Sequence, residues 1–155
     1  LERLLHLAKR QRQPLCFMLL DLDRFKLVNE KHGRDAGNKV LRLLGEHLKQ
    51  SFGREDVVAR WGGEEFVVGI YGITREQGVS QLDSVLETWR QQKLTDAKNR
   101  TFQVTFSAGV VEYPQDGVNL QELYCIANAV LYQAKTSGQN QQCLVTSDQQ
   151  SVGRC

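Results

Sequence analysis

The stretch that decides the fold reads RWGGEEFVV and covers residues 60–68. Apolar runs lie on both sides of its two glycines, VVA before them and VVGI after them. This pattern predicts a β-hairpin that turns at Gly62-Gly63, because glycines tolerate positive φ and leave room for a ligand against the backbone. Glu64 and Glu65 concentrate negative charge at the turn. That charge indicates either a solvated hairpin tip or a site for a cation.

The composition is that of one globular domain. The chain has 155 residues, of which 41% are hydrophobic and 25% charged, and its net charge is +2. So small a charge gives no case for binding nucleic acid or a membrane through bulk electrostatics. Four cysteines without metal-like spacing are interpreted as free thiols, and there is no signal peptide or membrane-length apolar run. We therefore expect a cytoplasmic location, one domain over residues 1–145, and a flexible tail over 146–155.

Hydrophobic periodicity predicts helices that alternate with strands. Runs of strands interrupted by helices, with a hairpin among them, favour an α+β fold in which helices cover a largely antiparallel sheet. The helices are expected from residue 1 to near Pro14, over 25–32, from Val40 to near Gly53, over 78–92 and over 120–135. The strands are expected over 15–20, 57–59, 67–70, 102–111 and 143–145.

Carboxylates at two strand ends form the first candidate site. Asp21 follows the buried strand 15–20, and it meets Glu64 if that strand lies beside the hairpin. Hard oxygen ligands from one or two carboxylates suit Mg²⁺, which completes its shell with water and substrate phosphates. The alternative for Asp21 is that it caps the following helix.

Two lysines are candidates for binding phosphate. Lys26 lies where the backbone amides of Arg24 and Phe25 begin a helix, and a helix N-terminus with a nearby lysine favours phosphate. Lys135 follows the last apolar helix and precedes a Ser-Gly turn. Taken alone, each lysine is more typical of a solvated surface.

Together these motifs resemble the GGDEF domains of bacterial diguanylate cyclases. The matching motifs are DLDRFKLVN at 21–29, Gly33, Gly37-Asn38, RWGGEEF at 60–66 and AKTSG at 134–138, in order and at family spacing. The resemblance implies a central, mostly antiparallel five-stranded sheet flanked by helices, similar to adenylate cyclase catalytic domains and polymerase palms. That fold agrees with the order of elements predicted above.

The resemblance also implies an activity, the condensation of two GTP molecules into cyclic di-GMP and two pyrophosphates. Two domains would face each other as a homodimer, each holding one GTP, with an upstream sensor domain outside this chain. Asp21, the carbonyl of Leu22 and Glu64 would hold Mg²⁺, for which Mn²⁺ is a possible substitute, and Glu65 would be the neighbouring catalytic acid. Asn29 would read the guanine edge. The implied substrate-binding residues are Arg24, Phe25, Lys26, Asn29, Asn38, Gly62, Gly63 and Lys135.

Three positions depart from the family pattern. Asn38 stands where an aspartate commonly accepts two hydrogens from guanine, and an amide cannot accept both but pairs bidentately with adenine. Gln139 replaces an arginine near the phosphates or the dimer contact. Gly53 replaces the arginine of an inhibitory Arg-x-x-Asp site whose Asp56 is present, so we expect weak or absent product inhibition.

The departures leave two alternatives open. One is a catalytically silent domain that binds GTP and regulates a neighbouring domain. The other is a cyclase that accepts ATP as well as GTP, for which the amide of Asn38 is the support.

Overall fold

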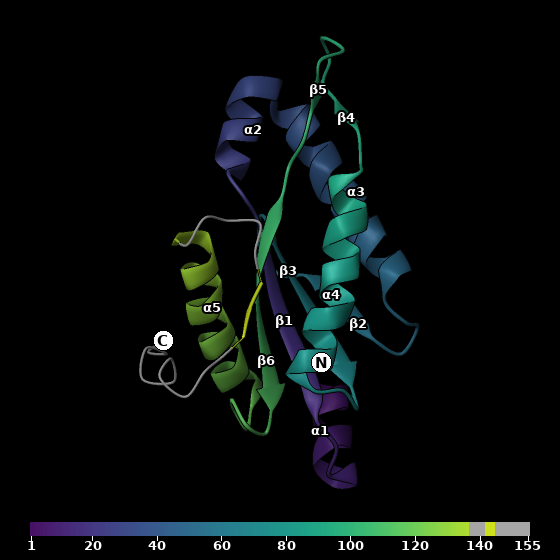
Figure 1. Ribbon diagram of the computed structural model, residues 1–155, viewed down its shortest axis with the longest axis vertical. Coiled ribbons are helices and arrows are strands. Elements are labelled where there is room, and N and C mark those ends of the chain that lie inside the picture. Colours follow the sequence, from purple (N-terminus) through teal and green to yellow (C-terminus); the bar gives the residue numbers. More distant parts are fainter. Residues whose placement is uncertain (137–141, 145–155) are drawn as a thin grey trace.

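A five-stranded sheet is the centre of the molecule (Figure 1), which we describe from a computed structural model over residues 1–136 and 142–144. The strands run in the order β2-β3-β1-β6-β7, and all neighbours are antiparallel except β6 and β7. This confirms the predicted α+β fold. The strands are β1 (Leu15–Leu22), β2 (Val57–Arg60), β3 (Glu65–Tyr71), β6 (Phe106–Tyr113) and β7 (Gln142–Leu144).

Helices cover both faces of the sheet, with α5 on one side and α3 and α4 on the other (Figure 1). Side chains of β1 alternate between two cores, as the two-residue period of a strand requires. Cys16, Met18, Leu20 and Leu22 pack toward α3 and α4, whereas Leu15, Phe17 and Leu19 pack toward α1 and α5. The helices are α1 (Glu2–Gln11), α2 (Phe25–His32), α3 (Arg34–Ser51), α4 (Arg75–Arg90) and α5 (Leu120–Thr136).

Two helices begin earlier than predicted. α3 starts at Arg34, directly after Gly33, although the apolar pattern becomes regular only at Val40. α4 starts at Arg75, because Thr74 and Gln77 form a capping box that satisfies its first backbone amides. The sequence reading followed hydrophobic periodicity and missed these polar starts.

The single strand predicted over 102–111 is wrong. β6 begins at Phe106, and a separate short strand, β5 (Thr101–Phe102), pairs with the unpredicted β4 (Leu94–Thr95). The segment between β5 and β6 hydrogen-bonds elsewhere. The indole of Trp89 donates to the carbonyl of Val104, and the amide of Asp23 donates to the carbonyl of Thr105.

The cysteines divide into two kinds. Cys16 is a free thiol in the core, and burial raises its pKa to about 12. Cys125 is disulfide-bonded, so its interpretation as a free thiol is wrong. No helix among residues 1–136 is long and apolar enough to cross a membrane. The predicted tail at 146–155, Gln139 and the Ser137-Gly138 turn lie outside the described residues, and the single domain over 1–145 stays a prediction.

Candidate active site

The sheet brings the C-terminal end of β1 beside the glycine hairpin. Asp21 pairs with Glu65 in the β1–β3 ladder. Residues directly opposite in an antiparallel pair share a face, and the alternation along β1 places Asp21 on the same face as Leu19, toward α5. The expected meeting of the two acidic segments is therefore observed.

The hairpin between β2 and β3 turns at the predicted glycines. The guanidinium of Arg60 holds the turn by donating to the carbonyl of Gly63 at 2.6 and 3.1 Å and to that of Gly62 at 3.2 Å. Neither glycine has a positive φ, so the turn does not use that freedom of glycine. A methyl group on Gly63 would meet no atom within 4 Å, and one on Gly62 would approach only Glu65, at 3.9 Å. The space above the turn is thus open to a ligand.

The carboxyl group of Asp21 is under electrostatic strain. Its pKa is raised to about 7, first by burial and then by Glu64 and Glu65, including a side-chain hydrogen bond with Glu64, while Lys135 lowers it. Its Oδ1 atom is buried without a hydrogen-bond partner. Carboxylates drawn together in this way indicate a place where a cation is favoured.

The ammonium group of Lys135 lies against these acids rather than at a separate phosphate position. It donates to the carbonyl of Leu22 at 3.1 Å and to Oδ1 of Asp23 at 3.2 Å, and it lies 3.8 Å from Oδ2 of Asp21. Asp23, which sequence reasoning left out of the site, is 5% exposed and also accepts from the hydroxyls of Thr105 and Ser107. Its two-residue spacing from Asp21 was the available signal, since such residues share a strand face.

Tyr124 is a second residue that sequence reasoning missed. Its hydroxyl donates to Oε1 of Glu65 at 3.1 Å, and its ring lies 5.5 Å from that of Trp61, beside the glycines. Trp61 in turn lies 6.1 Å from Phe17. This aromatic row ties the hairpin to α5 and orients Glu65. No local signal in the sequence points to a contact that spans so many residues.

The N-terminus of α2 presents backbone amides, as predicted. Arg24 precedes the helix in the left-handed conformation (φ 53°) and makes no side-chain cap. A non-glycine residue in this conformation is uncommon and is often found at functional sites. Phe25 is a core residue, 9% exposed, so only its backbone is available to a ligand, whereas Lys26 is exposed.

The two asparagines lie on neighbouring helices. Oδ1 of Asn29 on α2 is buried without a hydrogen-bond partner. A methyl group on Gly37 of α3 would overlap this atom, which explains the glycine at that position. Asn38 follows it, is exposed, and borders a hollow of about 440 Å³ that Arg60 and Phe66 also line.

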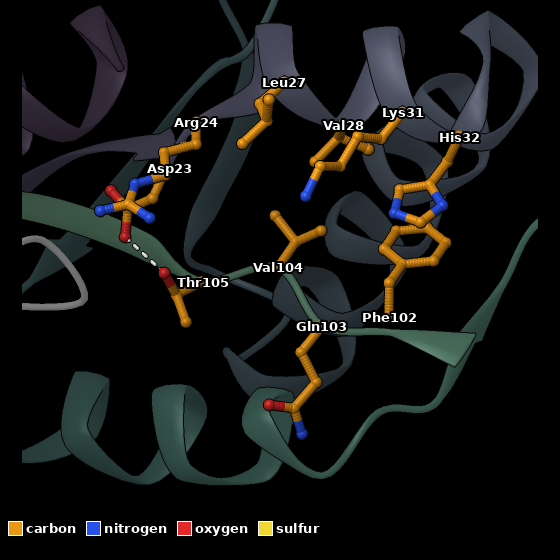
Figure 2. Close-up of a pocket in the computed structure, with 10 residues that line it drawn as sticks. All are labelled: Asp23, Arg24, Leu27, Val28, Lys31, His32, Phe102, Gln103, Val104 and Thr105. Carbon is orange, nitrogen blue, oxygen red and sulfur yellow. Dashed lines mark hydrogen bonds between the residues drawn. The ribbon is translucent and has the colours of Figure 1, made fainter. Parts of the chain in front are cut away.

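A further cavity of about 420 Å³ lies between α2 and the segment that joins β5 to β6 (Figure 2). Of the predicted site residues only Arg24 lines it, and Leu27 and Lys31 face Val104 across it. The stacked rings of His32 and Phe102, with centroids 4.0 Å apart, close its far end. Asp23 and Thr105 also line it, so the cavity adjoins the acidic site on the side of Asp23.

The residues at the end of β1 fit a hard divalent cation. Asp21 offers a buried oxygen without a partner, the Leu22 carbonyl already contacts an ammonium group, and the negative charge of Glu64 acts on Asp21 and raises its pKa. Within the described residues no three His, Cys, Asp or Glu side chains form a metal-binding group. Mg²⁺ does not require one, since it keeps several waters and takes one or two carboxylates.

Fold and site together define the class of protein. It is an α+β domain in which a pair of carboxylates faces an open glycine hairpin. The chain belongs to the GGDEF family, because the family model "Diguanylate cyclase, GGDEF domain" matches residues 1–141. The resemblance seen in the motifs is confirmed.

Solved structures agree with this assignment. The active GGEEF domain of a diguanylate cyclase from Vibrio cholerae is 26% identical, with a TM-score of 0.84 over 94% of this chain and 91% of that one. The GGDEF domain of YfiN from Pseudomonas aeruginosa is 25% identical, with a TM-score of 0.87 over 93% of this chain and 89% of that one.

Curated relatives are longer proteins. The probable diguanylate cyclase DgcT of Escherichia coli K12 is 33% identical over 86% of this chain and 30% of its own length. The cyclic di-GMP phosphodiesterase NbdA of Pseudomonas aeruginosa is 35% identical over 81% of this chain and 16% of its own length. The chain spans between 16% and 42% of the length of the first relatives that it matches.

Proposed function

We propose that this domain condenses two GTP molecules into cyclic di-GMP with release of two pyrophosphates, in a Mg²⁺-dependent reaction of a homodimer. The observation that carries the proposal is the buried, unpartnered oxygen of Asp21 beside the Leu22 carbonyl and Glu64. These three groups would hold Mg²⁺. When bound, the ion supplies neutralisation of phosphate charge and activation of a coordinated hydroxyl.

In each half-reaction the 3′-oxygen of one GTP bonds to the α-phosphorus of the other, and the bond from that phosphorus to the bridging oxygen breaks. Pyrophosphate leaves with the electron pair. The proton of the 3′-hydroxyl passes to Glu65, whose carboxylate is oriented by the hydroxyl of Tyr124. The open turn at Gly62-Gly63 leaves room for the reacting groups.

The other predicted residues bind the nucleotide. The uncapped N-terminus of α2, with the exposed Lys26, is placed for the phosphates. Oδ1 of Asn29 is an acceptor without a partner, which suits a hydrogen of the guanine edge. Because one domain holds one GTP, a second copy must supply the other, and turnover requires a two-fold dimer. Segments outside this chain would control that assembly.

Product inhibition through the Arg-x-x-Asp position should be weak or absent. Gly53 has no side chain to offer, and Oδ2 of Asp56 accepts from the amide of Gly53 at 2.7 Å. The amide of Asp56 donates back to the carbonyl of Gly53. The carboxylate therefore belongs to a local turn.

The proposal is tested with the chain fused to a dimerising coiled coil, so that assembly does not limit turnover. Equal GTP and ATP are supplied with Mg²⁺, and products are identified by mass spectrometry. Cyclic di-GMP alone is the expected product. The variant Glu64→Gln is expected to make no product but to fold normally in the absence of nucleotide.

Two results would redirect the proposal. Bound GTP without product, in the enforced dimer, would overturn the cyclase and favour a silent regulatory domain. Adenine-containing dinucleotides would show that Asn38 relaxes base selection, since its amide can pair with adenine.

A further inference from the structure

We propose that Lys135 is a tethered counter-cation that occupies the acidic site until a nucleotide draws it away, so that the metal and the nucleotide bind cooperatively. This inference rests on the proposed function, because it assumes that a nucleotide–metal complex is the substrate. It assigns to Lys135 a role in the nucleotide-free protein, in addition to the predicted contact with phosphate.

The first observation is that the lysine and the proposed metal share the same oxygens. The ammonium group hydrogen-bonds to the Leu22 carbonyl at 3.1 Å and lies 3.8 Å from the Asp21 carboxylate. Both groups are proposed metal ligands. Two cations that share these ligands repel each other, and the repulsion is strong where water is scarce. At 24% and 18% exposure, the side chains of Lys135 and Asp21 are largely shielded from water.

The second observation is that the carboxylate closest to the lysine, that of Asp23, keeps other hydrogen-bond donors when the lysine leaves. Asp23 also accepts from Ser107 at 2.7 Å and from Thr105 at 2.6 Å. Its carboxylate therefore stays hydrogen-bonded when the ammonium group moves, although its side chain is 3% exposed. Asp21 differs, because its buried Oδ1 has no partner. Departure of the lysine leaves Asp21 in need of another cation.

The third observation is that the lysine has the means to move. It lies in the last turn of α5, one residue before the helix ends, and a lysine side chain is a point charge on a flexible stem. The highly negative triphosphate of a nucleotide competes for that charge. In exchange, the acids receive the divalent ion that the phosphates carry with them.

The experiment measures Mn²⁺ affinity by titrating the free ion and following its electron paramagnetic resonance signal. It uses this 155-residue chain, with and without a GTP analogue whose α,β-bridge is methylene and therefore inert to the reaction. Without nucleotide, Lys135→Gln is expected to bind Mn²⁺ about tenfold more tightly than the wild type. The reason is that the variant lacks the repulsion, partly screened by water, between the ammonium group and the bound ion. The analogue should tighten Mn²⁺ binding by a larger factor in the wild type than in the variant.

Lys9→Gln is the matched control, since it removes the same charge from an exposed residue that, like Lys135, lies in the last turn of its helix, here α1. Its Mn²⁺ affinity without nucleotide should equal that of the wild type. Lys135→Arg retains the positive charge and should also bind Mn²⁺ weakly. The inference is overturned if Lys135→Gln binds Mn²⁺ no more tightly than the wild type, or if Lys9→Gln produces the same gain. Should Lys135→Gln fail to fold, an intact Lys135→Met decides in the same way.

These results are independent of whether the cyclase proposal holds. If the enforced dimer makes no cyclic di-GMP, the Mn²⁺ affinities of the wild type and Lys135→Gln can still be compared, and the presence or absence of the tenfold difference still decides the role of Lys135. An active cyclase with no such change retains its proposed function and loses only the counter-cation role of Lys135.

Discussion

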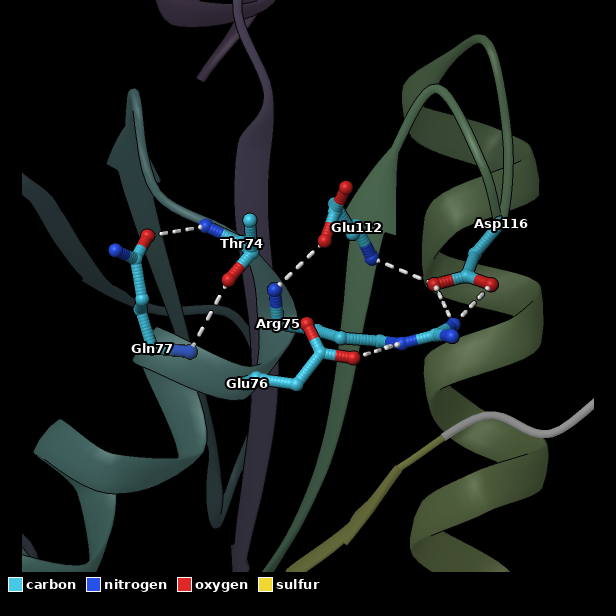
Figure 3. A network of polar contacts seen from close by, with 6 residues as sticks. All are labelled: Thr74, Arg75, Glu76, Gln77, Glu112 and Asp116. Carbon is cyan, nitrogen blue, oxygen red and sulfur yellow. Dashed lines mark hydrogen bonds and ion pairs between the residues drawn. The ribbon is translucent and has the colours of Figure 1, made fainter.

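Carboxylates that lie near the two ends of β1, Asp116 after β6 and Asp21 on β1 itself, are in opposite conditions. Near the start of the strand, Asp116 accepts two hydrogen bonds from the guanidinium of Arg75, at 2.9 and 3.1 Å, and one from the amide of Glu112 (Figure 3). Glu112 in turn accepts from the amide of Arg75 at 2.8 Å. At the far end of the strand Asp21 keeps a buried oxygen without a partner, and its pKa is raised to about 7 by burial and by Glu64 and Glu65.

The difference separates stabilising acids from reactive ones. A buried carboxylate matched by an arginine and backbone amides holds elements together, here α4 and the end of β6. Breaking such a pair is costly. Asp21 is unmatched in the sense that its Oδ1 has no hydrogen-bond partner and its nearest cation, Lys135, lies 3.8 Å from Oδ2. Such a carboxylate costs stability in the free protein and is retained where a ligand completes it. Substitutions at the two ends should therefore have opposite effects on folding and on turnover.

The largest expected effect is at the unmatched end. Asp21→Asn removes a proposed metal ligand and is expected to reduce cyclic di-GMP formation by a factor of at least ~10²–10³, the order for losing one electrostatic stabiliser of a transition state. Its melting temperature should equal or exceed that of the wild type, because a strained charge is gone. Product is quantified by mass spectrometry and melting by calorimetry. Unchanged turnover would remove Asp21 from the metal site.

A carboxylate introduced at position 38 tests whether an acid at this site is completed by its ligand, here the guanine base. Asn38→Asp should tighten GTP binding by a factor of about ten to a hundred, since an ionised carboxylate accepts both hydrogens of the guanine edge. Affinity for ATP should not rise. Isothermal titration with inert analogues of GTP and of ATP, each with a methylene α,β-bridge, measures the ratio of the two affinities. An equal gain for both bases would show that Asn38 does not read the base.

Substitution of Asp116, the carboxylate that is paired with Arg75, should change the stability of the fold rather than turnover. Asp116→Asn leaves the guanidinium of Arg75 with only the exposed Glu76 as a charged partner. We expect a loss of about 2 kcal/mol in the free energy of unfolding, reduced from the fully buried value because Arg75 is partly exposed. Urea denaturation measures this loss. Glu76→Gln is the control, since Glu76 also contacts Arg75 but is 62% exposed and should cost under about 0.5 kcal/mol. Equal losses would mean that burial does not distinguish the two pairs.

Much of the fold was predictable from hydrophobic periodicity. The continuous apolar runs of β1 and β3 follow from the burial of both faces of each strand. β4 and β5 were not predictable in this way, since each has two residues and depends on distant partners. Oδ1 of Asp96 accepts hydrogen bonds from the amides of Lys98 and Arg100 in the turn that joins β4 to β5. The indole of Trp89 on α4 donates to the carbonyl of Val104, which follows β5.

The site residues that belong to short motifs could be predicted from the sequence. Those that reach the site only through tertiary packing could not. The types and spacing of Asp21, Glu64 and the hairpin glycines predicted that these segments lie together, and the structure pairs Asp21 with Glu65 at the start of β3. The contacts of Asp23, Tyr124 and Lys135 depend on how α5 lies on the sheet, which no short pattern encodes. Lys135 illustrates this limit, since its residue type predicted a phosphate contact and the packing places it on the acids.

The smallest expected effect concerns the group that orients Glu65. Tyr124→Phe keeps the ring that contacts Trp61 and removes only the hydroxyl that donates to Glu65. Burial, and then the charge of Glu65, raise the pKa of Tyr124, so the hydroxyl stays protonated and donates throughout the neutral range. Losing one such hydrogen bond costs about 1 kcal/mol, so we expect turnover to fall about fivefold at unchanged melting temperature.

Tyr132→Phe is the matched control, because Tyr132 lies on the same helix and is 70% exposed. Turnover of this variant should equal that of the wild type. If Tyr124→Phe also turned over at the wild-type rate, the partner of Glu65 would be dispensable, and the reactive end of β1 would depend on the unmatched Asp21 alone. A fivefold loss without a change in melting temperature would instead show that the reactive end contains one matched carboxylate beside the unmatched one, with orientation rather than stability as its purpose.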